Sequence, residues 1–314
     1  MTRLLHLIGL ACLCLMTYAS AWAQPGGKAV IWLVTTDASP IYREVADTMR
    51  AEVERLHPAG IEWLVVAAKE FESATPPAPR LIVTVGSGAF AAVVTTLRAS
   101  EKSPPILATL LPRVAFDRDI ARAPQRPQAS AVLLDQPPAR QAALIRAALP
   151  TAKRIGLLLG PESKPMQSSV QTALSAQGLA SHVEDVTQRG MFAALQNLLD
   201  DSDALLALAD PAVFNSETVA SILTAGYRRK VPLIAFSAAY VKAGALLAIY
   251  ATPEQVARDG ARVVGAVLAG LPLPAPATPS EFTIGINSVV ARSLGLSLSE
   301  DELRRQMRRE EGKP

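Results

Sequence analysis

A repeated unit of apolar strand, turn and helix decides the fold class of this chain. Its clearest copy lies at Arg80–Ser100, where the β-branched run Leu81–Val85 is followed by a glycine turn at 86–88 and a helical stretch at Ala89–Arg98. An unbroken apolar run is typical of a parallel strand covered on both faces. The unit is therefore half of a β-α-β motif and predicts a parallel α/β sheet.

The same alternation recurs along the chain and restarts after residue 130. Further strands are predicted at Ala29–Val34, Ile61–Val66, Ile106–Leu111, Ala129–Leu134, Arg154–Leu159, Ser181–Val186, Ala204–Leu208, Val231–Phe236, Leu246–Tyr250 and Phe282–Ile286. Helices are predicted at Pro40–Leu56, Pro138–Ala148, Met166–Gln177, Met191–Leu199, from a cap at Asn215 and Ser216 to Arg229, and at Pro253–Leu268. A polar loop is predicted around Ala121–Gln128, and Ser299 with Glu302 forms a capping-box pattern for a last helix.

This order predicts two Rossmann-like three-layer lobes, each built on a parallel sheet. Residues 24–130 plus 251–290 are assigned to lobe I, residues 131–250 to lobe II, and residues 291–314 to a C-terminal helical tail. Because lobe I is completed by a segment that returns from lobe II, several crossings join the lobes. That connectivity indicates a hinge.

The N-terminus predicts export. Arg3, an apolar run over 4–19 and an Ala-x-Ala site make residues 1–23 a cleaved secretory signal peptide. A retained anchor is the alternative, but the run is shorter than the roughly 20 residues that span a bilayer. Cys12 and Cys14 lie in this segment, so the mature chain has no thiol for a disulfide or a metal site. We therefore expect a periplasmic protein without a metal or other cofactor.

Composition argues against nucleic-acid binding and against catalysis. The formal net charge is only +3, and the basic run 304–309 is flanked by acidic residues, so no basic surface is predicted. The mature chain has two histidines, His57 beside Pro58 and His182 within a strand, and neither is placed to activate Ser87. We expect no enzymatic activity.

The glycine turn admits three interpretations. Gly86, Gly88 and Ala91 match a dinucleotide-binding fingerprint, but that fingerprint belongs to the first strand of its domain, and at least two strands precede this one. A purely structural turn is the second interpretation. The third is a backbone contact to another small ligand, because ligands of parallel sheets bind beyond the carboxyl ends of the strands.

The same rule selects the other candidate binding residues. Asp210 follows an apolar strand and precedes Pro211, and it is either an acceptor for ligand or a turn-capping carboxylate. Arg113 follows Pro112 at a strand end, where it either pairs with a ligand carboxylate or is simply solvated. Five aromatic side chains next to predicted turns either stack on a planar ligand or belong to the core: Phe90, Phe214, Phe236, Tyr240 and Tyr250.

Four stretches carry a family resemblance: the turn GSGAF at 86–90, LALADPAVFNSETV within Leu205–Val219, the run from Val231 to Ala261, and FTIGINSVVARSLGL at 282–296. Over nearly the whole mature chain the sequence resembles the two-lobed periplasmic substrate-binding proteins of ABC-type uptake systems, in the branch with aromatic amino acid binders. The resemblance implies the type I periplasmic-binding-protein fold, with a ligand held by turns of both lobes.

Carried over to this chain, the resemblance implies ligand contacts at Thr36, Ser87, Gly88, Asp210 and Ser237. Many relatives have a negative residue after the hinge strand, whereas this chain has Ile249-Tyr250-Ala251-Thr252, which argues against an ammonium-binding role. With Arg113, Phe236 and Tyr240, these residues form the predicted ligand-binding set.

The function expected from the sequence is capture of a small polar, amino-acid-like or otherwise carboxylated solute by hinge closure. The expected partners are that solute and an inner-membrane ABC permease, with the protein acting as a monomer. The alternative is a sensory or accessory protein of the same fold that acts on a membrane receptor. An extracytoplasmic enzyme is a remote third possibility.

Overall fold

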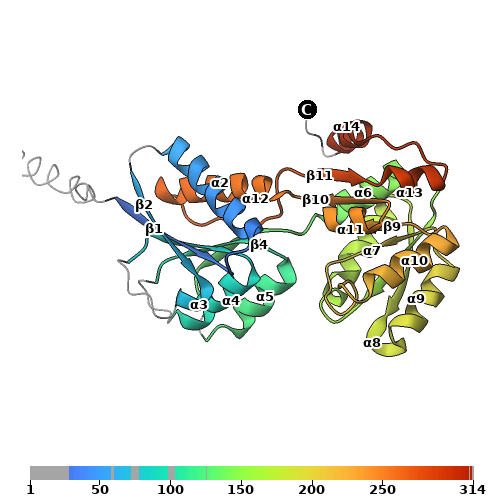
Figure 1. Cartoon of the computed structure of the whole chain (residues 1–314), viewed down its shortest axis with the longest axis horizontal. Coiled ribbons are helices and arrows are strands. Elements are labelled where there is room, and N and C mark those ends of the chain that lie inside the picture. The colour runs from blue at the N-terminus through green and yellow to red at the C-terminus, as the bar shows by residue number, and fades with distance from the viewer. Residues whose placement is uncertain are drawn as a thin grey trace, which may run out of the picture.

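The computed structural model describes residues 28–57, 60–71, 78–97, 103–124, 126–310 and 312 of the chain. They form two α/β lobes that lie side by side along the long axis of the molecule (Figure 1). The predicted signal peptide, residues 1–23, lies outside the described residues. Within the described ranges, no helix has both the length and the apolar character needed to cross a bilayer.

Lobe I is built on a five-stranded parallel sheet in the order β2-β1-β3-β4-β5. Its strands are β1 (Ala29–Thr35), β2 (Ile61–Ala67), β3 (Leu81–Val85), β4 (Ile106–Leu111) and β5 (Ala129–Leu133). Its helices are α2 (Pro40–Leu56), α3 (Ala68–Phe71), α4 (Ser87–Thr96), α5 (Arg113–Arg122) and α12 (Pro253–Leu268). Figure 1 shows α2 and α12 over one face of this sheet and α3, α4 and α5 over the other.

Two apolar layers hold lobe I together. On one face, Val45 and Met49 of α2 meet Ala257 and Val264 of α12 above the sheet. On the other face, the rings of Phe90 and Phe116 stack at 5.0 Å. Every residue of the central strand β3 is buried, as its unbroken apolar run predicts.

Lobe II is built on a six-stranded sheet in the order β11-β10-β9-β8-β6-β7, in which only β11 is antiparallel. Its strands are β6 (Arg154–Leu159), β7 (Ala180–Asp185), β8 (Ala204–Leu206), β9 (Leu233–Ala235), β10 (Leu247–Tyr250) and β11 (Thr283–Ile286). One face carries α6 (Pro138–Ala148), α7 (Gln167–Ala176), α13 (Ser288–Ser293) and α14 (Glu300–Glu310). The other carries α9 (Met191–Asp200), α10 (Val219–Arg229) and α11 (Ala238–Ala243), while η1 (Lys164–Met166) and α8 (Val186–Arg189) are short connecting turns.

Three crossings join the lobes, at residues 134–137, 251–252 and 269–282. Arg140 of α6 ties the first crossing to the third, because its guanidinium donates to Gln136 Oε1 at 2.8 Å and to the Pro279 carbonyl at 3.3 Å. The same guanidinium lies 4.6 Å above the centre of the Phe282 ring. The first and third crossings are therefore connected through Arg140.

The division of the chain differs from the sequence expectation in its last segments. Strand β11 lies in the stretch assigned to lobe I, but it pairs antiparallel with β10 and so belongs to lobe II. Strand β5 runs past residue 130 and stays in lobe I. The expected tail is packed on lobe II, where Leu303 and Met307 of α14 join the core. Helix α5 was not expected, and it occupies most of the stretch between Pro112 and the predicted polar loop.

Candidate functional site: a pocket between the lobes

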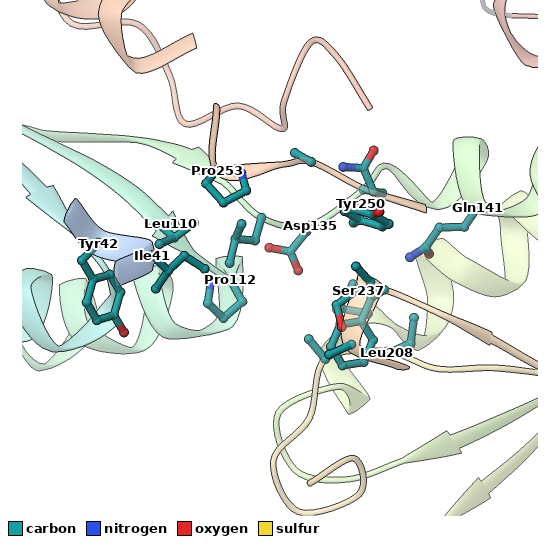
Figure 2. Close-up of a pocket in the computed structure, with 18 residues that line it drawn as sticks. Ile41, Tyr42, Leu110, Pro112, Asp135, Gln141, Leu208, Ser237, Tyr250 and Pro253 are labelled. Atoms are coloured by element: carbon teal, nitrogen blue, oxygen red, sulfur yellow. The ribbon is translucent and has the colours of Figure 1, made fainter. Parts of the chain in front are cut away.

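A cavity of about 540 Å³ opens between the two lobes. It is lined by 18 residues from both lobes and two crossings (Figure 2): Ile41, Tyr42, Leu110, Pro112, Leu134, Asp135, Gln136, Gln141, Met166, Leu208, Ala209, Phe236, Ser237, Ala238, Ala239, Tyr250, Ala251 and Pro253. Most of these side chains are apolar. A volume of this size accommodates a small molecule.

The topology of the sheets explains the position of this cavity. Lining residues follow the carboxyl ends of β4, β5, β8, β9 and β10, where parallel sheets leave a crevice for ligands. At Leu110 the register of β4 shifts against β5, and the residue adopts φ 57°, which is uncommon for a leucine. Bulges of this kind redirect side chains near binding sites, and Leu110 lines the cavity.

Asp135 is the only carboxylate in the lining. It directly follows Leu134 on the first crossing, and its Oδ2 accepts the backbone N–H of Arg113 at 2.5 Å. Burial raises the pKa of the Asp135 carboxyl above its usual value, against the opposing effect of that hydrogen bond and of the Arg113 charge. The carboxyl group is therefore poorly solvated.

Three aromatic side chains line the cavity from different elements. Tyr42 comes from α2, Phe236 from the turn after β9, and Tyr250 from the end of β10. Burial raises the pKa of the Tyr250 phenol, which stays neutral and presents an amphipathic ring. The lining thus offers aromatic surface for an apolar part of a ligand.

Phe236 and Ser237 are the two predicted ligand contacts that line the cavity. Tyr240, also predicted, is outside the lining and packs behind it, with its ring 4.9 Å from Phe236 and 6.3 Å from Phe214. Burial raises the pKa of the Tyr240 phenol. Tyr240 supports the wall of the cavity through Phe236.

The glycine turn and Thr36 lie outside the lining as well. The Thr36 hydroxyl donates to the Val85 carbonyl at 3.1 Å and accepts the backbone N–H of Ala89 at 3.0 Å. A Cβ on Gly88 would meet Thr36 Cγ2 at 2.6 Å, and Gly86 has φ 95°. Thr36 thus occupies a helix-start N–H that was expected to face a ligand. A ligand contact at Thr36, Ser87 or Gly88 stays a prediction that this placement does not favour.

The carboxylate of Asp210 is hydrogen-bonded within the protein. Its side chain accepts the N–H groups of Glu162 at 3.0 Å and Ser163 at 2.8 Å, the Ser163 hydroxyl at 2.8 Å and the N–H of Ala212 at 3.0 Å. The residue is 1% exposed and does not line the cavity. These contacts match the turn-capping interpretation.

Arg113 begins α5 beside the cavity but is not part of its lining. Its backbone N–H is used by Asp135. The expected pairing of its guanidinium with a ligand carboxylate stays a prediction. Among the described residues, no group of three or more His, Cys, Asp or Glu side chains could hold a metal ion.

Sequence reasoning passed over Asp135 and Gln141. The signal for Asp135 was present, because it follows the apolar run of β5 as Asp210 follows that of β8. Gln141 lies in the first turn of α6, where helical periodicity alone predicts neither face. Its position in the lining depends on how α6 meets the crossing.

The sequence matches a family model described as ABC transporter substrate binding protein over residues 72–308. The chain belongs to this family. Proteins of the family bind small molecules for ABC transporters outside the cytoplasm. A comparison with curated protein sequences gives no match.

Solved structures share the fold. An ABC domain from Streptococcus pneumonia in complex with L-Trp is 15% identical, with a TM-score of 0.61 over 88% of this chain and 98% of that one. The ligand-free, open structure of a substrate-binding protein with adhesive properties from Clostridium difficile is 17% identical, with a TM-score of 0.66 over 87% and 97%. A periplasmic ribose ABC transporter protein from Conexibacter woesei is 13% identical, with a TM-score of 0.55 over 88% and 98%. The chain therefore has the type I periplasmic-binding-protein fold.

Proposed function

We propose that this protein captures a small, amino-acid-like solute in the cavity between its lobes and delivers it to an inner-membrane ABC permease. The observation that carries the proposal is the cavity itself, which lies at the strand ends of both lobes and beside two hinge crossings. Closure of such lobes on a ligand buries it from both sides. Export through the N-terminal signal peptide and action as a periplasmic monomer belong to the same proposal.

The lining favours a solute with an apolar or aromatic part. Tyr42, Phe236 and Tyr250 offer rings, while the polar groups able to orient a ligand are Asp135, Gln136, Gln141 and Ser237. The Streptococcus relative holds L-Trp, a molecule that combines these two characters. An aromatic amino acid or a related compound is therefore the first solute class to test.

The test is a thermal-shift screen of amino acids, aromatic amines, organic acids and sugars on the mature protein. A ligand at a hundredfold excess over its Kd stabilises the folded state by about 2.7 kcal/mol. For a protein of this size that corresponds to a shift of several degrees. Small-angle X-ray scattering should show a smaller radius of gyration with the same ligand, as hinge closure requires.

A blocking variant locates the binding site. Ala239 lines the cavity and is exposed, so Ala239→Trp fills part of the cavity without entering the core. Ala51 is an exposed alanine on the unrelated surface of α2, and Ala51→Trp is the matched control. The shift should disappear in the first variant and persist in the second. A ligand whose shift survives Ala239→Trp binds elsewhere, and the cavity assignment then fails.

A further inference from the structure

The lining of the cavity contains an acidic side chain but no basic one. Of the lining residues, Asp135, Tyr42 and Tyr250 carry ionisable side chains, and the lining includes no lysine, arginine or histidine. The only group that adds a formal charge near neutral pH is thus an acid. A ligand carboxylate would find no cationic side chain in this lining, and next to Asp135 it would meet repulsion in a poorly solvated space.

Asp135 is held in place but not saturated. The N–H of Arg113 fixes Oδ2, and the residue's own backbone N–H contributes a second contact. A carboxylate can accept about four hydrogen bonds, so capacity remains. Figure 2 shows the carboxylate of Asp135 between the labelled side chains of the two lobes.

The charged residues near Asp135 do not neutralise its carboxylate as a bound cation would. Arg113 and Asp117, both on α5, act on the carboxyl with opposite signs, and Asp117 is exposed. Burial is the largest influence and opposes ionisation. A positive group placed in the cavity would reverse that balance.

The side chain of Gln141 has a buried hydrogen-bond acceptor without a donor in the described part of the chain. The residue is 4% exposed and lines the cavity, yet its Oε1 accepts no hydrogen bond from the described residues. A buried acceptor without a partner costs about 1–3 kcal/mol, and native proteins rarely leave one unpaired. In Figure 2, Gln141 extends from α6 toward the space that Asp135 also faces.

We propose that the cavity recognises its ligand by a protonated amine, which pairs with Asp135, and that the Gln141 side chain turns so that its Oε1, now buried away from the open space, accepts a further N–H of the same ligand. The aromatic side chains of the lining then cover the apolar body. This proposal rests on the proposed function and makes it more specific: the amine is required, and a carboxylate is not.

Three indole compounds of similar shape separate the possible head groups. Tryptamine carries an ammonium, tryptophol a hydroxyl and 3-indolepropionate a carboxylate, and calorimetric titration of the mature full-length chain at pH 7 gives each affinity. We expect tryptamine to bind at least about tenfold more tightly than tryptophol, because a charge-assisted pair is lost in the alcohol. We expect the acid to bind more weakly still.

Substitutions test which residues of the lining bind the amine. Asp135→Asn keeps the side-chain volume and should lower tryptamine affinity by at least about 30-fold, as expected for truncating one partner of a poorly solvated charge pair. Gln141→Met removes the acceptor at similar size and should cost about tenfold. Asp117→Asn is the matched control, because this exposed carboxylate lies nearby on α5 outside the lining, and it should change the affinity less than twofold.

Equal binding of tryptamine and 3-indolepropionate would overturn the proposal, as would unchanged tryptamine affinity in Asp135→Asn or no binding of tryptamine at all. Melting curves of each variant show that it is folded. The two proposals fail differently. If a solute from the screen binds in the cavity, as Ala239→Trp shows, but ignores Asp135, only the amine requirement is wrong. If no solute binds there, the proposed function fails as well.

Discussion

Asp210 and Asp135 both follow the carboxyl end of a buried parallel strand and lie close to a proline, one in each half of the molecule, yet their surroundings differ. Asp210 is 1% exposed and accepts four hydrogen bonds from its own lobe. Asp135 is partly exposed in the cavity, and in the described part of the chain its one hydrogen bond from another residue comes from the N–H of Arg113. The same sequence pattern has produced a turn-holding carboxylate in lobe II and an unsaturated one in lobe I.

The neighbouring loops explain the difference. In lobe II the loop over 160–163 directs two backbone N–H groups and the Ser163 hydroxyl at Asp210. In lobe I the turn after β4 begins with Pro112, which has no N–H to donate, and among the described residues Arg113 is the one neighbour that donates a hydrogen bond to Asp135. The supply of donors from the adjacent loop therefore decides whether such a carboxylate is free to meet a ligand.

The largest expected effect comes from Asp210→Ala. The substitution removes four hydrogen bonds and leaves the N–H groups of Glu162 and Ser163 without their acceptor. We expect a loss of about 3 kcal/mol or more in the free energy of unfolding, seen as a melting temperature lower by roughly 10 °C. Asp210→Asn keeps one oxygen and should lose less. A melting temperature within 2 °C of the parent protein would contradict the turn-holding role.

Gly160→Ala tests the same loop from the opposite side. A Cβ at this position would meet Asp210 Oδ2 at 2.7 Å, and the four donors prevent the carboxylate from moving away. We expect a cost of about 1–3 kcal/mol in a urea denaturation series. Gly285→Ala is the control, because its Cβ would lie at 3.4 Å from the ring of Tyr250, an ordinary contact. Equal stabilities of the two variants would argue against a fixed Asp210.

Asp135 predicts a pH dependence of opposite sign to an ordinary paired carboxylate. Because burial raises its pKa in the folded state, the folded protein holds this proton more tightly than the unfolded chain. Stability is therefore fully present below the unfolded pKa and falls as the pH rises through the folded pKa. Asp135→Asn should remove that fall, so denaturation from pH 3 to pH 7 should show the variant gaining on the parent.

Asp185 gives the comparison for this experiment. Its hydrogen bond with Lys164, followed by those with Thr187, lowers its pKa to about 2. Its contribution is therefore present above the unfolded pKa and is lost as the pH falls toward 2. Asp185→Asn should lose stability relative to the parent as the pH rises. If the stability of both variants relative to the parent changed in the same direction with pH, the opposite pKa shifts of Asp135 and Asp185 would not explain the result.

The sequence predicted elements with strong local signals to the residue. Strands Leu81–Val85 and Arg154–Leu159 are unbroken apolar runs, and helix Pro253–Leu268 starts at a proline behind the Thr252 cap. Helix α5 was missed because its arginines and aspartates resemble a polar loop, although Phe116 is buried. The lobe to which β11 belongs depends on its pairing with β10, a tertiary contact without a local signature.

The site was predicted only in part for a related reason. Phe236 entered the predicted set as an aromatic residue next to a predicted turn and Ser237 through the family resemblance, and both line the cavity. The rule that ligands lie beyond strand ends could not choose between Asp210 and Asp135, because both follow buried strands. What separates them is the number of N–H groups supplied by a loop nearly 50 residues away for Asp210 and 22 away for Asp135. That number is fixed by packing.

The smallest effect on stability is expected from an ion pair that joins the lobes outside the lining of the cavity. Arg118 of α5 donates to Glu162 Oε1 at 3.1 Å, and the same guanidinium pairs with Asp119 at 2.9 Å. Glu162→Gln weakens the Arg118–Glu162 pair between the lobes and leaves the Arg118–Asp119 pair intact. Because both side chains of this pair are about one-third exposed, its loss should change the free energy of unfolding by less than about 1 kcal/mol.

The same substitution removes a contact between the lobes that only certain hinge angles permit, so the ligand-free protein should show a larger radius of gyration in X-ray scattering. Asp119→Asn is the control within lobe I and should leave that radius unchanged. A radius that is the same in Glu162→Gln and the parent would show that the hinge angle is set by the crossings alone, with Arg140 as their main connection.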